Sequence, residues 1–368
     1  MASKPDRAMC EERVSGARVS PQPFMHSRTE TTTPAVAPSP GSSASAGADA
    51  APRPPILRPL LLTLRPHQWV KNLFVMAPMF FHKDVFLRVH DESGRGVRDA
   101  AFLNLTVTSR AAAATGVFCL LAGAVYTIND IVDVDADRVH PIKRGRPLAS
   151  GQVPEATART MAVALIALSL ALSYALAPML ALVALAYFVE NLLYSFWLKK
   201  IAFLDVALIA LGFVLRVLAG GIATDVHVSG YMLACTALLA LYLGFGKRRH
   251  ELALENAGKQ RAALEAYSVR SLTIALAVTG TATALTYVAY TLDPVTRAFF
   301  SSNYLWLTAP FTAFGILRFM LLVSGRAGRG LRAESPTQEM LRDVPFVLNL
   351  VVWVAVVVAI VYQLRPNN

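Results

Sequence analysis

The feature that most constrains this chain is a series of long apolar runs, separated by short polar connectors, that begins near residue 70. A helix that spans a bilayer needs about 20 consecutive, mainly apolar residues. Backbone polar groups in lipid must be hydrogen-bonded within the segment, so such runs are predicted to be α-helices. Nine transmembrane helices are expected, near residues 70–88, 101–128, 158–176, 179–197, 203–222, 231–246, 271–291, 304–323 and 345–363.

The composition agrees with an all-α, polytopic membrane protein. Of the 368 residues, 55% are hydrophobic and 16% are charged, whereas about a quarter of the residues of a soluble domain are charged. The formal net charge is +11, but the basic residues lie in the connectors. That distribution is typical of membrane topology and not of a nucleic-acid groove. The bilayer is therefore an expected partner, and nucleic acid is not.

The basic connectors also predict an orientation. Most Lys and Arg residues of the apolar region lie in the connectors that follow the second, fourth, sixth and eighth expected helices. Positively charged connectors stay in the cytoplasm. The expected location is the plasma (inner) membrane, with the N-terminus in the cytoplasm and the C-terminus outside.

The first part of the chain has a different character. Residues 1–55 are rich in Ala, Ser, Thr and Pro and show no apolar periodicity. Such a segment cannot bury enough apolar surface to offset its conformational entropy. A disordered low-complexity tail is expected over 1–55, without a secretory signal, and the membrane domain is expected over 56–368.

A cluster of acidic residues directly follows the second apolar run. The chain there reads AVYTINDIVDVDADRVHPIKRGRP and contains Asn129, Asp130, Asp133 and Asp137. Asp130, Asp133 and Asp137 share one face of a helix, because successive side chains turn by about 100°. Ionisable residues at membrane depth are costly and usually functional, and carboxylate oxygens suit Mg²⁺. The pattern predicts a magnesium site, with a solvated acidic helix end as the simpler alternative.

Three basic residues come next. Lys143, Arg144 and Arg146 follow the aspartates within a few residues. Cations beside a magnesium site are suited to an anionic substrate, since the metal bridges phosphate oxygens and the cations hold the others. Membrane topology alone would also supply these residues.

At this motif the sequence resembles the UbiA superfamily of intramembrane prenyltransferases. The family signature N-D-x-x-D-x-x-x-D is matched by Asn129, Asp130, Asp133 and Asp137. The resemblance implies nine transmembrane helices around a lateral cavity that is open to lipid, with an active site that faces the cytoplasm. It covers roughly residues 60–365.

Within the superfamily, several stretches are similar to the decaprenyl-phosphate phosphoribosyltransferase branch. These are RPHQWVKN (65–72), NDIVDVDADRVHPIKRGRPLASG (129–151), YSFWLK (194–199), LRVLAGG (215–221) and GKRRHEL (246–252). The resemblance implies transfer of 5-phosphoribose from phosphoribosyl diphosphate to a polyprenyl phosphate, with release of diphosphate. It also implies a role in the synthesis of cell-envelope polysaccharide precursors.

One departure favours this branch over aromatic prenyltransferases, which carry a second aspartate signature after the sixth helix. Here that region reads GFGKRRHELALE, without aspartate. Glu251 and Glu255 share a helix face, and Lys247, Arg248 and Arg249 lie beside them. A mixed site of this kind suits a donor with an additional phosphate, although a loop charge run would read the same.

Other polar residues lie at the edges of apolar runs. The resemblance places Lys71 and Asn72 beside the donor, although Lys71 would also suit snorkelling to lipid headgroups. Tyr194 and Lys199 match the mouth of the family's cavity, and Lys199 is expected to hold a phosphate.

An arginine lies in the middle of an expected helix. Arg216 must face the interior and find a partner there, because an isolated charge in lipid is costly. Two interpretations remain open for it. It pairs with Glu190 in a structural role, or it binds an anionic lipid headgroup.

The resulting hypothesis is a Mg²⁺-dependent enzyme with phosphoribosyl diphosphate and polyprenyl phosphate as substrates. Its predicted catalytic residues are Asp130, Asp133, Asp137, Lys199 and Glu251, and its predicted metal ligands are Asp130, Asp133 and Asp137. Its predicted substrate-binding residues are Lys71, Asn72, Asn129, Lys143, Arg144, Arg146, Tyr194, Lys247 and Arg248.

Two alternatives stay open. A prenyltransferase would move an isoprenoid chain from its diphosphate to an aromatic or lipid acceptor with the same metal chemistry. A cation transporter is less favoured, because transport sites usually lie near the midplane and between repeats. The sequence leaves the oligomeric state open, a homo-oligomer included.

Overall fold

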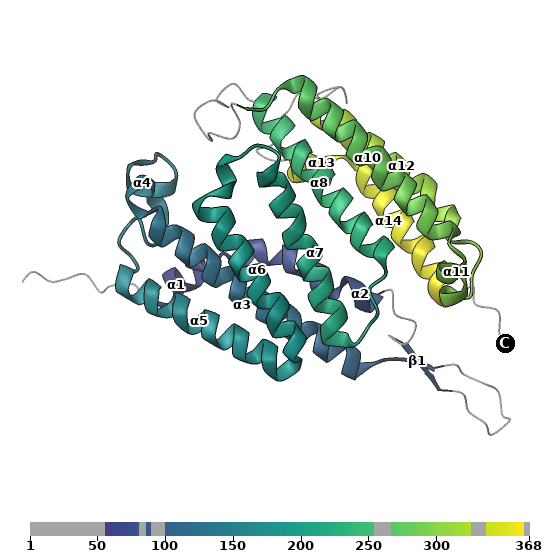
Figure 1. Cartoon of the computed structure of the whole chain (residues 1–368), viewed down its shortest axis with the longest axis horizontal. Helices are drawn as coiled ribbons and strands as arrows, with labels where there is room; N and C mark the ends of the chain where they lie inside the picture. The colour runs from purple at the N-terminus through teal and green to yellow at the C-terminus, as the bar shows by residue number, and fades with distance from the viewer. Residues whose placement is uncertain (1–55, 81–85, 90–99, 254–265, 325–335, 364–368) are drawn as a thin grey trace, which may run out of the picture. The chain divides into compact units, whose positions relative to one another are not determined.

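The computed structural model describes residues 56–80, 86–89, 100–253, 266–324 and 336–363 (Figure 1). The tail expected over 1–55 lies outside these residues, as does Glu255. The described chain is helical apart from one short hairpin, in which β1 (Phe86–Val89) pairs antiparallel with β2 (Ala100–Leu103).

Eight helical segments are long and apolar enough to cross a membrane in the described part of the chain. They coincide with the second to ninth expected helices, so the prediction of an all-α, polytopic membrane fold is confirmed. Their bounds are α3 (Leu105–Val132), α5 (Glu155–Leu176), α6 (Pro178–Phe196), α7 (Leu204–Thr224), α8 (Gly230–Ala253), α10 (Val269–Leu292), η6 with α12 (Leu305–Thr308 and Ala309–Val323) and α14 with η7 (Val344–Val358 and Ala359–Gln363).

The first expected helix, over 70–88, differs. After α1 (Leu57–Thr63), the chain forms a 3₁₀ segment, η1 (Pro66–Met76), and a short α2 (Ala77–Phe80), and β1 follows at Phe86. Pro78 lies inside the expected helix and lacks the N–H group that an α-helix needs in its interior. No spanning helix is therefore found over the described residues of this stretch.

Short elements connect the spans. Those near the charged connectors are α4 and η3, between α3 and α5, and η4, between α6 and α7. The bounds of the short elements are α4 (Val134–Val139), η3 (Lys143–Gly145), η4 (Leu198–Lys200), α11 (Pro294–Phe300) and α13 (Pro336–Arg342).

Two apolar cores hold the helices together. In the first, η1, α3, α6 and α7 meet around Phe118, Leu180 and Ala219. In the second, α8, α10 and α12 meet beside Val206 of α7, around Tyr242. Figure 1 shows α7 between these two groups of helices.

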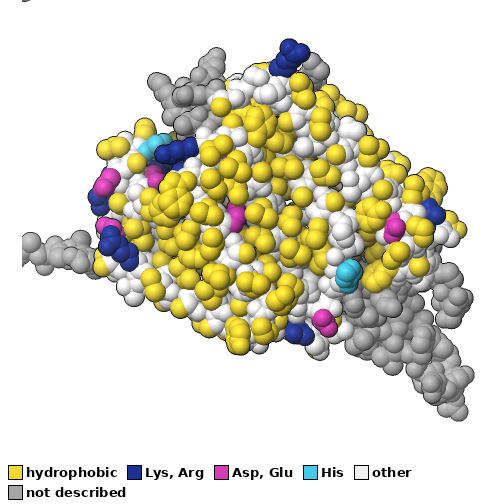
Figure 2. Space-filling view, viewed as in Figure 1, with side chains coloured by type: hydrophobic (Ala, Val, Ile, Leu, Met, Phe, Trp, Pro, Cys, Tyr) yellow, Lys and Arg dark blue, Asp and Glu magenta, His cyan; other side chains and the backbone are white. Residues whose placement is uncertain are grey.

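The surface is suited to lipid. Figure 2 shows a face that is covered mainly by hydrophobic side chains, with its charged side chains mostly toward the rim. Large apolar residues of α14 such as Leu348, Val351 and Val354 are exposed in the isolated chain. Soluble monomers rarely expose so much contiguous apolar surface, so this is an integral, multi-pass membrane protein.

One glycine lets η1 pass directly against α7. A Cβ atom on Gly220 would lie 1.8 Å from the carbonyl oxygen of Val75. That distance is far inside any van der Waals contact, so only glycine fits. This contact fixes η1 on α7 and thereby places Lys71 and Asn72.

Replacing Gly220 by Ala should therefore push η1 away from α7. We expect a loss of stability of about 1–3 kcal/mol, the usual cost of overpacking a core, measured as a lower melting temperature in detergent. Gly116→Ala in α3 is the matched control, because a Cβ there meets nothing within 4 Å. Equal melting temperatures for the two variants would contradict this account of η1.

Candidate active site

Two buried aspartates lie where α3 turns into α4. Asp130 belongs to the last turn of α3, and Asp137 to α4, and each is only 3% exposed. Between them Asp133 ends α3 with φ −91° and ψ 6°, which redirects the chain. Arg146 joins the two carboxylates, because its Nη1 lies 3.2 Å from Asp130 Oδ1 and 2.5 Å from Asp137 Oδ2.

Two further cations approach this pair. Arg65 donates a hydrogen bond to Asp130 Oδ1, and its guanidinium lies 5.1 Å from the ring centre of Tyr126. The Nζ of Lys143 lies 3.9 Å from Asp137 Oδ1. The carboxylates are thus buried but compensated, as buried charges must be.

The pair is chemically suited to a divalent cation. Mg²⁺ usually binds one or two carboxylates and completes its octahedron with water and substrate phosphates. Asp130 and Asp137 supply two such carboxylates at one point. Among the described residues, no group of three or more His, Cys, Asp or Glu side chains is placed to hold a metal.

The other two residues of the motif stay predictions. Asp133 and Asn129 are half-buried, and neither side chain makes a hydrogen bond or ion pair within the described residues. The shared face expected for the three aspartates assumed one continuous helix. The turn at Asp133 interrupts that helix, so the structure joins Asp130 to Asp137 without Asp133.

Lys71 projects among like charges. Its side chain is exposed on η1, and Lys247, Arg216 and Arg65 all repel its ammonium group. These residues come from different elements of the fold. An anion placed among them would relieve the repulsion, which supports the prediction of a phosphate contact at Lys71.

Arg216 is satisfied inside the bundle by neutral groups. It donates to Asn72 Oδ1 (2.8 Å), to the Gly212 carbonyl oxygen (2.9 Å) and to the Tyr187 hydroxyl (2.8 Å). No hydrogen bond or ion pair joins it to Glu190 within the described structure. These contacts favour the structural interpretation, with hydrogen-bond partners that differ from the expected Glu190.

Asn72, predicted to bind substrate, is 1% exposed. Its side chain accepts from Arg216 and donates to Cys119 Sγ at 3.4 Å. These contacts connect η1 to α7 and α3. The neighbouring Lys71 faces the cations described above, so Asn72 anchors the segment that presents it.

A second buried charge network ends α8. Arg248 is 1% exposed and donates to Asp205 Oδ2 (2.7 Å) and Glu251 Oε2 (2.6 Å). Tyr267 donates to Asp205 Oδ1 (2.6 Å) and accepts from the Phe203 N–H (2.6 Å). Burial raises the pKa of the Tyr267 hydroxyl. The network fastens α7, α8 and the start of α10 together.

The predicted residues of α8 thus fall into two kinds. Arg248 is enclosed by its ion pairs, one with fully buried Asp205 and one with half-buried Glu251. Lys247 is 51% exposed, and its Nζ lies 3.9 Å from Glu251 Oε1. Lys247 is therefore the residue of this group that an anionic substrate reaches most easily.

Three other predicted residues remain without a described partner. Tyr194 and Lys199 are half-buried at the end of α6 and in η4, and Arg144 is exposed within η3. None of the three makes a side-chain hydrogen bond or ion pair within the described ranges. Their roles stay predictions.

Three residues of these networks were absent from the predicted site. Arg65 stands at the start of a stretch that carries the family resemblance, which was a usable signal. Asp205 gave a weaker one, as a carboxylate at the start of an apolar run. Tyr267 gave none, because its contact with Asp205 depends on the tertiary packing.

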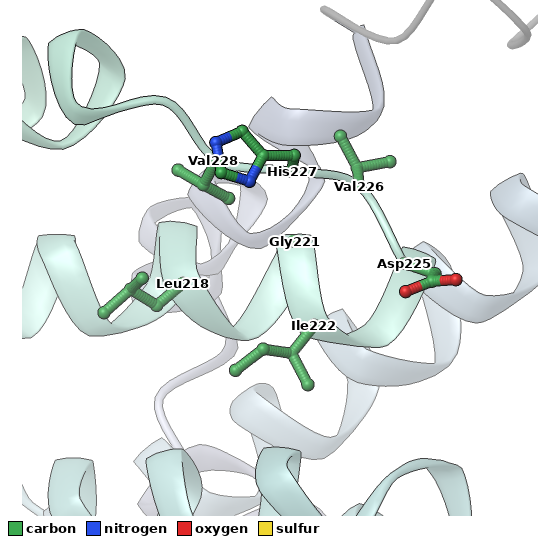
Figure 3. Close-up of a pocket in the computed structure, with 7 residues that line it drawn as sticks. All are labelled: Leu218, Gly221, Ile222, Asp225, Val226, His227 and Val228. Atoms are coloured by element: carbon green, nitrogen blue, oxygen red, sulfur yellow. The ribbon is translucent and has the colours of Figure 1, made fainter.

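The structure also has a shallow pocket of about 380 Å³ at the far end of α7 from Asp205 (Figure 3). Asp225 and His227 lie on its wall, but Figure 3 shows that their side chains are well separated from each other. Neither Asp130 nor Asp137 lines this pocket, so it is separate from the carboxylate pair.

Removing one partner from the α8 network should be costly. Asp205→Asn leaves a buried arginine with less compensation, which typically costs about 3–5 kcal/mol, and we expect a clear drop in melting temperature in detergent. Asp135→Asn is the control, since Asp135 is exposed and its ion pair within the described residues is with exposed Arg138. An Asp205→Asn protein as stable as this control would show that the network is not structural.

Comparisons with known proteins show the family of this chain. The model of the UbiA prenyltransferase family matches residues 100–334. The chain is 36% identical over 319 residues to a decaprenyl-phosphate phosphoribosyltransferase of Mycobacterium tuberculosis, an alignment that covers 85% of this chain and 98% of that protein. It is 34% identical over 308 residues to the protein of the same name from Corynebacterium glutamicum, covering 82% and 86%.

Solved structures support the fold. A UbiA homologue from Archaeoglobus fulgidus bound to DMAPP and Mg²⁺ superimposes with a TM-score of 0.57 at 20% identity, over 83% of this chain and 99% of that one. The same homologue bound to Cd²⁺ gives a TM-score of 0.54 at 18% identity, over 82% and 99%. The chain is a transferase that belongs to the UbiA prenyltransferase family, in its decaprenyl-phosphate phosphoribosyltransferase branch.

Proposed function

We propose that this protein transfers 5-phosphoribose from phosphoribosyl diphosphate to a polyprenyl phosphate of the decaprenyl type and releases diphosphate. The observation that carries the proposal is the buried Asp130–Asp137 pair, surrounded by arginine and lysine side chains at the end of α3. The similarity to named phosphoribosyltransferases extends over 98% of the length of the M. tuberculosis protein, so it includes this site.

Mg²⁺ is the proposed cofactor. Asp130 and Asp137 would hold it, with Asp133 and Asn129 as the further ligands that the motif predicts. Similar folds have been solved with Mg²⁺ and with Cd²⁺, which supports a divalent ion. When bound, such an ion neutralises negative charge on the departing diphosphate.

The donor phosphates would be held by basic residues around the carboxylate pair. Lys71 and Lys247 repel each other, and a donor with an additional phosphate would place negative charge between them. Arg144, Arg146 and Lys143 surround the connector after α4 and would hold the diphosphate. These cations stabilise charge that develops as the anomeric bond breaks.

The acceptor phosphate needs no strong general base, because its oxygen is already anionic. It attacks an anomeric carbon with oxocarbenium character, as in other glycosyl transfers. Tyr194 and Lys199, at the cytoplasmic end of α6 in the proposed orientation, would hold this headgroup. The isoprenoid tail would lie along the apolar surface of the bundle.

The location follows from the same orientation. The carboxylate pair and Lys247 would face the cytoplasm, where phosphoribosyl diphosphate is soluble, with the N-terminus inside and the C-terminus outside. The plasma membrane would supply the lipid substrate. The product would serve the synthesis of cell-envelope polysaccharide precursors.

Transfer of an isoprenoid chain is the second candidate function. The observation against it comes from the end of α8, where the carboxylates of Asp205 and Glu251 both form ion pairs with Arg248. A second aspartate signature for a prenyl diphosphate is absent from the sequence there. Cation transport is disfavoured by the position of the carboxylate pair at a helix end.

The direct assay uses purified protein, phosphoribosyl diphosphate labelled in the ribose, and polyprenyl phosphate. Label should enter the lipid phase, and a chelator should abolish the transfer. Label that stays in water, with prenyl transfer from a prenyl diphosphate to an aromatic acceptor instead, would overturn the proposed function.

Asp130→Asn and Asp137→Asn should each lower this transfer about 100-fold or more, the usual cost of removing one group that stabilises developing charge. Asp135→Asn should keep wild-type activity, because its carboxylate is exposed and 2.8 Å from Arg138 on the same short helix. Full activity in the Asp130 and Asp137 variants would refute the metal assignment.

A further inference from the structure

One guanidinium nitrogen contacts both carboxylates of the pair. Arg146 Nη1 lies within hydrogen-bond distance of both Asp130 Oδ1 (3.2 Å) and Asp137 Oδ2 (2.5 Å). A positive group therefore lies at the point where a divalent ion would have to bridge the two carboxylates. The ion and the guanidinium need the same oxygens.

A second arginine reaches the same oxygen. Arg65 also donates to Asp130 Oδ1. Its backbone is left-handed, with φ 52° and ψ 62°, directly before Pro66. A non-glycine residue in this region stores strain and persists only where its surroundings hold it. Here the bond to Asp130 and the stacking on Tyr126 do so.

The two arginine side chains are exposed enough to move away from the carboxylates, whereas the aspartate side chains are enclosed in the interior. The side chains of Arg65 and Arg146 are 23% and 29% exposed, whereas that of Asp130 is 3% exposed. Both arginines thus reach the carboxylates from the polar rim. A diphosphate at that rim offers them bidentate oxygen acceptors, which guanidinium groups prefer.

We propose that Arg65 and Arg146 compete with the divalent ion for the Asp130–Asp137 pair and pass to the diphosphate of the donor when the ion binds. This deepens the proposed function and rests on a diphosphate donor. The binding of ion and diphosphate is then coupled, and such coupling is reciprocal. The ion alone binds weakly, because two cations oppose it at a few ångström.

The local charges allow a clean control. Lys143 also faces Asp137, but at 3.9 Å, beyond a direct hydrogen bond. Arg138 lies on α4 itself, and its ion pair among the described residues is with exposed Asp135. Arg138→Gln removes one positive charge near the site and leaves the contacts of the carboxylate pair untouched.

The test is a titration of the full-length protein in detergent with Mn²⁺ alone, followed by electron paramagnetic resonance. Arg146→Gln and Arg65→Gln should bind Mn²⁺ about tenfold more tightly than the wild type, a coupling of ordinary size. Arg138→Gln should bind it as the wild type does. A gain in one variant alone assigns the competition to that arginine.

The direction of the change in Mn²⁺ affinity distinguishes competition by the arginines from support by them. If the arginines only support the carboxylates, their removal weakens Mn²⁺ binding, and unchanged or weaker binding in both variants overturns the proposal. Thermal melting of each variant is measured alongside. If one arginine variant does not fold, the Mn²⁺ affinity of the other arginine variant decides the test. The titration contains no phosphoribosyl donor, so it is decided separately from the transfer assay, whose failure would instead remove the proposed function.

Discussion

The pairing of buried carboxylates with arginine is the interaction on which the rest of this structure depends. A charge in the interior of a membrane protein is tolerated only with a partner. The pairs of Arg65 with Asp130 and of Arg248 with Asp205 also join elements that are distant in the sequence, so satisfying these charges positions the helices. The pairs of the described buried aspartates are Asp130 with Arg65 and Arg146, Asp137 with Arg146, Asp205 with Arg248, and Asp343 with Arg318.

These ion pairs have two different roles: one stabilises helix packing, and the other lies in the candidate active site. Arg248 is enclosed with Asp205 and holds α7, α8 and the start of α10 in place. Arg146 is partly exposed and lies on carboxylates that suit a divalent ion. The hydrogen bond from Arg216 to Asn72 and the close passage of η1 over Gly220 then position the segment that carries Lys71. Rigid packing thus presents a small number of movable cations.

The membrane spans were predictable because lipid imposes one simple demand, a long apolar segment with satisfied backbone groups. The stretch over 70–88 met that demand in composition, but its described residues form a 3₁₀ segment and a short helix that starts beside Pro78. The acidic motif was found from the sequence, although the turn at Asp133 changed which carboxylates meet. Contacts such as Arg65 with Asp130 depend on the tertiary fold, which no local pattern encodes.

The most direct measurement is an experimental structure of the protein with phosphoribosyl diphosphate and Mg²⁺ bound. We expect the ion to contact Asp130 and Asp137, the diphosphate to lie against the ion, and Arg146 to have moved onto the diphosphate. A donor bound at a distance from these aspartates, with Arg146 still between them, would contradict the account.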